Sequence, residues 1–356
     1  SRGRAFSTGA WGSLSNCPQF HGEGKLGSFG GLRGVFLSRC VSRKIDGNER
    51  MKAARQTTLR EQVTVSGIGV HSGLPVNLTL NPADADTGIV FSRTDSAGRE
   101  REIRADYRAV TATELATVLG DASGVLCSTA EHILAALRGL GVDNALVEVD
   151  GPEVPIMDGS AAPFVAAIDQ AGIVELSETR RYIKVLKPVR VAKGESFGEL
   201  RPYENGFRLD IEIDFPSVLI GRQQIALDLT ADAFRRDLSR ARTFGFMKDV
   251  SALWSAGKAL GASFENTLVL SENRVLNAEG LRFTDEFIRH KVLDAIGDLY
   301  LLGHSLIGEF SGFKSGHALN NRLLRKLIST TSAWREVTFE SLKDAPISYV
   351  PAAVNA

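Results

Sequence analysis

Apolar and polar positions follow two different periods along this chain, and the period predicts the elements. From Phe207 to Phe215 every second residue is apolar with charged residues between, which predicts a strand with one buried and one solvated face. Short apolar runs broken by Gly, Pro and Asp predict further strands. These runs lie at 62–70, 76–80, 88–92, 145–149, 182–191 and 305–312.

Helical signals separate these strands. Ser128, with Glu131 three residues later and Gly141 beyond the last apolar position, predicts a helix over 128–140 that Ser128 caps. Apolar residues spaced by three and four predict another helix over 318–332, with Leu319, Leu323 and Leu327 on one face. Further helices are predicted at 163–171, 231–239 and 285–302.

The order of these elements predicts the fold class. Residues 51–180 and 181–356 each show strands first and helices afterwards, which favours an α+β fold of two domains, each a sheet layered with helices. Residues 1–50 differ: they contain ten Gly, eight Lys plus Arg and three Asp plus Glu, a net charge of +5. We expect this basic leader to be disordered. It is either a targeting peptide or, the interpretation we favour, a non-native segment upstream of a true start at Met51.

Composition excludes several classes of protein. Lys plus Arg and Asp plus Glu both number 42, so no net basic charge points to nucleic acid as a partner. No run of 18 apolar residues predicts a transmembrane span. The three cysteines have no CxxC spacing, which argues against a disulfide framework and a cysteine zinc site and favours a reducing compartment.

One stripe of the helix predicted over 285–302 carries candidate chemistry. His290 and Asp294 are four residues apart and therefore share a face, and Asp298 continues the same stripe. A zinc ion fits between an imidazole and a carboxylate at this spacing. The alternative is a solvated helix face, or a His–Asp pair that supports the helix.

Two other histidines add to this picture. His132 follows Glu131 and would serve as a remote third metal ligand, although Glu131 is equally explained as part of a helix cap. His317 precedes the last helix, where a cationic imidazole is disfavoured, so it needs a carboxylate such as Asp298 if it is to act as an acid. The alternative is a histidine at a helix start with no chemical role.

Five separated motifs occur together in one order, and together they closely resemble the UDP-3-O-acyl-N-acetylglucosamine deacetylases of lipid A synthesis in Gram-negative bacteria. The resemblance runs from about Arg55 to near Val350. Its motifs lie at 128–132 (STAEH), 157–161 (MDGSA), 239–245 (SRARTFG), 289–294 (RHKVLD) and 314–320 (KSGHALN).

The resemblance implies an active site between the two domains, with one zinc ion, or iron in its place, bound by His132, His290 and Asp294. It implies Glu131 as general base and His317 as general acid supported by Asp298. Thr243 would stabilise the oxyanion. The substrate-binding residues would be Phe244 and the two lysines Lys291 and Lys314, which would face the pyrophosphate of a UDP-linked acylated glucosamine.

It also implies that an insert at about 246–276 houses the fatty acyl chain, which on its pattern alone is equally an ordinary apolar helix and strand. We further expect a monomer in the cytoplasm, associated peripherally with the inner membrane. Two other functions stay open at this point: a zinc hydrolase for a different acylated sugar or nucleotide, and a non-catalytic module that binds nucleotide sugars.

Overall fold

The computed structural model describes residues 54–94 and 98–340, so the predicted leader 1–50 lies outside the described residues. The described residues fold into six α-helices and several sheets, which confirms the mixture of helices and sheets expected from the sequence. None of these helices is long and apolar enough to cross a lipid bilayer.

The first half of the chain builds a five-stranded sheet and two smaller ones. In the larger sheet β4 and β9 are parallel, and every other pair of neighbouring strands is antiparallel. Its order is β2 (Val63–Ile68), β3 (Pro75–Asn81), β9 (Ala145–Val149), β4 (Ile89–Thr94) and β5 (Glu100–Arg104). The smaller sheets are the pair β1 (Arg55–Leu59) and β10 (Ile173–Thr179), and the trio β6 (Val110–Ala112), β7 (Val118–Asp121) and β8 (Gly124–Cys127).

The second half builds a seven-stranded sheet around β18. The predicted alternation appears in β14, where the apolar residues are buried and the residues between them are half-buried. The strands are β11 (Arg181–Val185), β12 (Val189–Lys193), β13 (Ser196–Arg201), β14 (Phe207–Asp214), β15 (Arg222–Asp228), β18 (Ser305–Phe313) and β19 (Trp334–Thr338). The single strand predicted over 182–191 was wrong. It is divided between β11 and β12 near Pro188, a residue that cannot donate to a sheet ladder.

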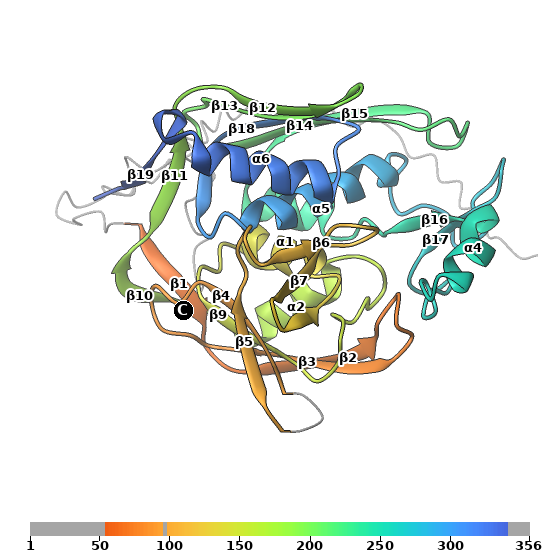
Figure 1. The fold of residues 1–356 in the computed structure, drawn as a ribbon, viewed down its shortest axis with the longest axis horizontal. Helices are drawn as coiled ribbons and strands as arrows, with labels where there is room; N and C mark the ends of the chain where they lie inside the picture. Colours follow the sequence, from red (N-terminus) through yellow and green to blue (C-terminus); the bar gives the residue numbers. More distant parts are fainter. Residues whose placement is uncertain (1–53, 95–97, 341–356) are drawn as a thin grey trace, which may run out of the picture. The chain divides into compact units, whose positions relative to one another are not determined.

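The helices form layers between the two larger sheets. Figure 1 shows α6 and α5 beside the seven-stranded sheet, and α1 and α2 beside the five-stranded one. Their bounds are α1 Glu131–Leu140, α2 Ala162–Ala171, α5 Glu286–Tyr300 and α6 His317–Ser329. The helix predicted over 231–239 is only a short α3 (Ala231–Ala233), capped by Thr230, that continues as a π-helix (Phe234–Leu238).

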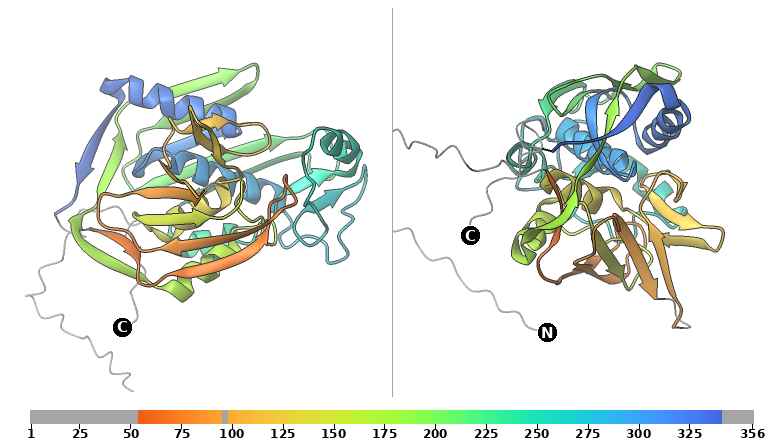
Figure 2. Two further views of the ribbon diagram at one scale, coloured as in Figure 1. Left: turned by 60° about the horizontal axis from the view of Figure 1, so that its bottom comes forward. Right: turned by 90° about the vertical axis from the view of Figure 1, so that its left-hand side faces the viewer.

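A smaller group of elements lies at one end of these layers in both Figure 1 and the left view of Figure 2. It contains the parallel pair of β16 (Phe244–Phe246) and β17 (Leu268–Leu270), with α4 (Val250–Ser255) between them in sequence. The helix and strand expected in the segment 246–276 are therefore present. Short 3-10 helices cover Met247–Asp249 and Thr331–Ala333.

Candidate active site

The contact between α1 and α5 determines where the predicted site residues meet. A Cβ atom on Gly297 of α5 would lie 2.0 Å from the main-chain oxygen of Glu131, so only glycine permits the two helices to approach this closely. At this crossing the start of α1, with Glu131 and His132, faces the stripe of α5 that carries His290 and Asp294. Residues more than 150 positions apart in sequence are thus brought into one buried group.

Three of these side chains form a group that could hold a metal ion. Their ligand atoms, from His132, His290 and Asp294, all lie within 4.8 Å of one another, and all three residues are buried. Asp294 Oδ1 lies 3.3 Å from Nε2 of His290 and 3.5 Å from Nε2 of His132. Among the residues that the structure describes, this buried oxygen accepts no hydrogen bond. A buried carboxylate oxygen normally accepts a hydrogen bond or binds a cation, so the lack of a hydrogen-bond partner for Asp294 Oδ1 among the described residues indicates a cation site.

The surroundings prepare this group for a cation. His290 donates a hydrogen bond through Nδ1 to the main-chain carbonyl of Ala241, at 3.0 Å, which leaves Nε2 facing Asp294. Burial lowers the pKa of His290 to about 3, so the ring is neutral and its Nε2 carries a free lone pair. Burial alone would raise the pKa of Asp294, but its charged surroundings, with Lys291 in direct contact, outweigh burial and hold that pKa well below its usual range.

His317 stands beside this group between two carboxylates. Its Nδ1 lies 2.9 Å from Oδ2 of Asp298 and 3.0 Å from Oδ1, and its Nε2 lies 3.8 Å from Oε1 of Glu131. Burial alone would lower the pKa of His317, but Asp298 overrides it and raises that pKa to about 10. Burial raises the pKa of Glu131, against the opposing effect of His317. The arrangement joins a protonated imidazole to a carboxyl group that binds a proton more readily than usual.

The turn before α1 corrects one prediction. Ser128 does not cap the helix, because α1 begins after Ala130 without a side-chain cap and Ser128 pairs as a β-bridge with Glu153. Thr129 has a φ of 59°, which is unusual for a β-branched residue. Its hydroxyl donates to the buried carboxylate of Glu153 at 2.8 Å. The carboxylate of Glu131 accepts the N–H of Thr117 at 3.0 Å and lies 3.8 Å from Nε2 of His317.

A cavity of about 690 Å³ opens beside these residues. This volume is in the range typical of sites for small molecules. Its polar end contains Glu131, His132, Thr243, His290, Asp294 and His317, and its apolar wall includes Phe215, Phe246, Leu253, Trp254, Phe264 and Val269. The wall belongs largely to the segment that was expected to be the insert.

The remaining predicted residues divide into two groups. Thr243, Phe244 and Lys291 line the cavity, and the main chain of Thr243 is fixed by hydrogen bonds to Gly159 and Leu268. Lys291 Nζ lies 2.7 Å from Asp294 Oδ2. Lys314 is not among the lining residues, and its Nζ instead lies 2.9 Å from Asp214 Oδ2.

A buried ion pair holds the turn that carries Thr243. Arg242 is 2% exposed and Glu286, at the start of α5, is fully buried, and their side chains meet at 2.9 Å between Nε and Oε1. The pair joins the 239–243 turn to the helix that bears His290. Thr243 and the carbonyl of Ala241 are thereby fixed relative to His290.

Three residues of the site were not among the candidates named from the sequence. Thr117 bonds to both Glu131 and Asp298, yet it belongs to no motif. Asn320 donates to Asp298 at 2.8 Å, and its position three residues after His317 on a helix is a signal that would have found it. His71 lines the cavity from a loop whose main-chain N–H groups donate to Glu153.

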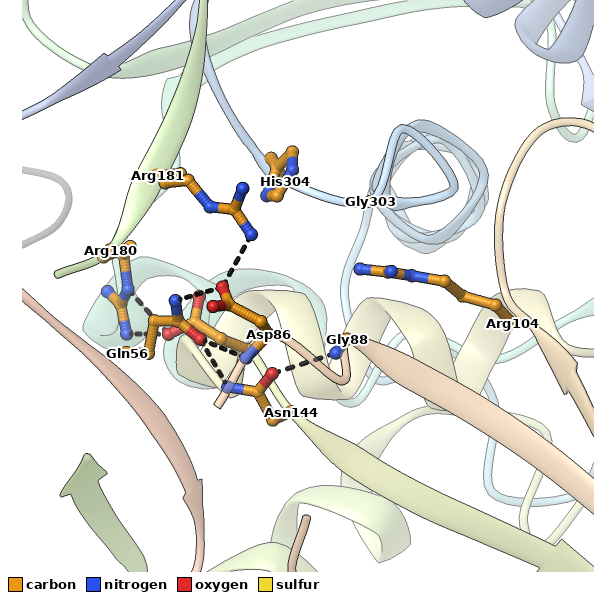
Figure 3. Close-up of a pocket in the computed structure, with 10 residues that line it drawn as sticks. Gln56, Asp86, Gly88, Arg104, Asn144, Arg180, Arg181, Gly303 and His304 are labelled. Carbon is orange, nitrogen blue, oxygen red and sulfur yellow. Dashed lines mark hydrogen bonds and ion pairs between the residues drawn. The ribbon is translucent and has the colours of Figure 1, made fainter. Parts of the chain in front are cut away.

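A second cavity, of about 20 Å³, has different chemistry. Figure 3 shows Arg181 and Arg104 approaching it from opposite sides, with Asp86 and His304 nearby. Arg181 is paired with Asp86 at 2.6 Å, and the space suits roughly one water molecule. The larger cavity, with its three buried ligands, is therefore the candidate active site.

The sequence is similar to known proteins of one family. The family model for LpxC, UDP-3-O-acyl N-acetylglycosamine deacetylase, matches residues 56–329. The UDP-3-O-acyl-N-acetylglucosamine deacetylase of Shewanella halifaxensis (strain HAW-EB4) is 50% identical over 300 residues, which cover 83% of this chain and 97% of the relative. The enzyme of that name from Vibrio campbellii (strain ATCC BAA-1116) is 50% identical over 297 residues, and the one from Aliivibrio fischeri (strain ATCC 700601 / ES114) is 48% identical over 298 residues. Each of these two matches covers 83% of this chain and 97% of the relative.

Proposed function

Since this chain belongs to the UDP-3-O-acyl-N-acetylglucosamine deacetylase family, we propose that its own residues His132, His290 and Asp294 bind the catalytic zinc ion. The substrate that the family name gives is a UDP-linked acylated glucosamine, and the reaction removes its N-acetyl group as acetate. The active site would lie between two domains, residues 51–180 and 181–356, because α1 supplies one ligand and α5 supplies two.

The unsatisfied oxygen of Asp294 carries this proposal. Zinc bonds of roughly 2.0–2.2 Å at tetrahedral angles separate neighbouring ligand atoms by about 3.3–3.6 Å. The distances from Asp294 Oδ1 to the two Nε2 atoms, 3.3 and 3.5 Å, match that separation. Two imidazole nitrogens and one carboxylate are also the donor set of many catalytic zinc sites, in which one position remains for water.

Glu131 and His317 would move the protons of the reaction. A bound zinc ion lowers the pKa of water to about 7 and polarises a carbonyl oxygen. Glu131 accepts a proton from the attacking water, for which a carboxylate with a raised pKa is well suited. His317 then donates a proton from Nε2 to the departing amine nitrogen, while Asp298 holds Nδ1 and stabilises the cationic ring.

Thr243 and the cavity wall would position the substrate. The hydroxyl of Thr243 donates to the oxygen on which negative charge develops as water attacks. The acyl chain occupies the apolar wall formed by the insert at 246–276. Phe244 binds the substrate within the cavity, and Lys291 and Lys314 face its pyrophosphate.

Acetate release from the UDP-linked substrate tests the proposal. We expect a chelator to abolish release, and zinc to restore it; adding Fe²⁺ in its place shows whether iron also serves. Release that persists at the full rate after complete metal removal would contradict the zinc assignment. Release that never occurs from a metal-loaded, folded protein would contradict the activity itself.

A further inference from the structure

Thr117 is the residue at which the base and the acid of the proposed mechanism are joined. It lies immediately before β7, and it is 1% exposed. It is not among the residues that line the cavity, so it is placed to act through its neighbours.

All three polar groups of Thr117 bond to segments of the site. Its hydroxyl donates to Oδ1 of Asp298 at 2.6 Å, and its main-chain N–H donates to Oε2 of Glu131 at 3.0 Å. Its carbonyl accepts the N–H of Ala130, at 3.2 Å, just before α1. One buried residue therefore contacts the partner of His317, the proposed base and the start of the helix that carries that base.

These bonds fix the orientation of both carboxylates. An ionised carboxylate can only accept, so the hydroxyl proton of Thr117 must point at Asp298 in a short, charge-assisted bond. Asn320 holds the other oxygen of Asp298, and the carboxylate cannot rotate away from Nδ1 of His317. The N–H of Thr117 holds Oε2 of Glu131, so Oε1 is the oxygen that faces Nε2 of His317.

We propose that Thr117 is a positioning residue that sets the relative placement of Glu131 and the His317–Asp298 pair. Its contacts with Glu131 and Asp298 are directed hydrogen bonds and not merely van der Waals packing. This inference rests on the proton-transfer roles proposed above. Loss of the hydroxyl should slow the chemical step more than it weakens substrate binding, since small errors in placing catalytic groups act mainly on kcat.

Thr117→Val tests this role because it removes the hydroxyl and keeps the shape and the main-chain N–H. We expect kcat for acetate release to fall about 10- to 100-fold, the effect of one hydrogen bond to a charged group. KM should change by less than about twofold, and bound zinc should be unchanged. Thr117→Ser, which restores the hydroxyl, should recover most of kcat.

Thr58→Val provides the matched control. Thr58 is also buried, and its hydroxyl accepts the N–H of Ala83 at 2.9 Å, far along the chain from the site residues. We expect it to lower the unfolding temperature and to leave kcat unchanged. If Thr117→Val does not fold, Thr117→Ala removes the same hydroxyl without adding a methyl group and is expected to show the same selective loss of kcat.

A double-mutant cycle with Asp298→Asn shows whether Thr117 acts through Asp298. If it does, Thr117→Val should cause little further loss of kcat in the Asp298→Asn protein. The proposal would be overturned if the kcat losses of Thr117→Val and Asp298→Asn were independent, or if Thr117→Val had the same kcat as Thr58→Val. It would also be overturned if Thr117→Ser did not recover kcat. His317→Ala separates the two hypotheses: wild-type activity in it would contradict the acid role itself, whereas an inactive His317→Ala beside a fully active Thr117→Val would contradict only the role of Thr117.

Discussion

Replacement of Asp298 by asparagine is the perturbation whose consequences the structure defines most fully. The carboxylate is 2% exposed and accepts hydrogen bonds from Thr117 at 2.6 Å and Asn320 at 2.8 Å, as well as contacting Nδ1 of His317 at 2.9 Å. Asparagine has the same size but no charge. Its amide NH₂ is a hydrogen-bond donor, whereas Thr117, Asn320 and His317 also donate at this position. The variant therefore removes the negative charge beside His317 with little change in packing.

The magnitude follows from the loss of one charged hydrogen bond to the imidazolium. Such bonds contribute about 1.5–3 kcal/mol, which corresponds to a decrease in kcat of about 10- to 150-fold. The direction of the pH effect is also determined. His317 acts while protonated, and Asp298 raises its pKa against the lowering effect of burial. Without Asp298 that pKa falls, so the high-pH limb of the rate profile should move to lower pH.

The assay is the pH dependence of acetate release by wild type, Asp298→Asn and a control, Asp143→Asn. Asp143 is a largely buried carboxylate paired with Arg180 at 2.7 Å, outside the candidate active site. The control should lose stability and keep the wild-type pH profile. An Asp298→Asn protein with an unshifted high-pH limb and nearly normal kcat would refute the reasoning that His317 is an acid supported by Asp298.

Three other sets of variants test separate parts of the account. His132→Ala and Asp294→Ala should each lose both zinc and activity, as measured by elemental analysis and acetate release; full metal content in either purified protein would count against the ligand assignment. Thr243→Val should lower kcat about 10²- to 10³-fold, the effect of removing one oxyanion donor, whereas Thr243→Ser should retain activity; equal rates in the two variants would argue against this role. Glu286→Gln should reduce the free energy of unfolding by about 1.5–3 kcal/mol, because it removes the charged acceptor of Nε of the buried Arg242 while Glu279 stays paired with Nη1 at 2.6 Å; urea unfolding measures this, and a loss well under about 1 kcal/mol would show that the pair with Glu286 does little for stability.

Local periodicity predicted which side chains share one face of a strand or helix. The alternation in β14 is visible in the chain because each strand residue points to one face of the sheet. The stripe of His290, Asp294 and Asp298 is visible for the same reason, since four residues make about one helical turn. The meeting of this stripe with His132 came only from the family resemblance, because it depends on the close crossing of α1 and α5 at Gly297.

Contacts between distant segments explain what could not be predicted. The hydrogen bond from Thr117 to Asp298 joins residues 181 positions apart, and neither residue type indicates the other as its partner. Glu131 fits a capping pattern in the sequence, but its carboxylate accepts the N–H of Thr117 instead. A local pattern names a possible partner, and tertiary packing decides which partner is used.

Anomalous diffraction at the zinc absorption edge, from crystals of the active enzyme, tests the central claim most directly. The account predicts one anomalous peak in the cavity, at roughly 2.0–2.2 Å from Nε2 of His132, Nε2 of His290 and Oδ1 of Asp294. A fully active enzyme whose only zinc peak lay elsewhere, or that showed none, would contradict it.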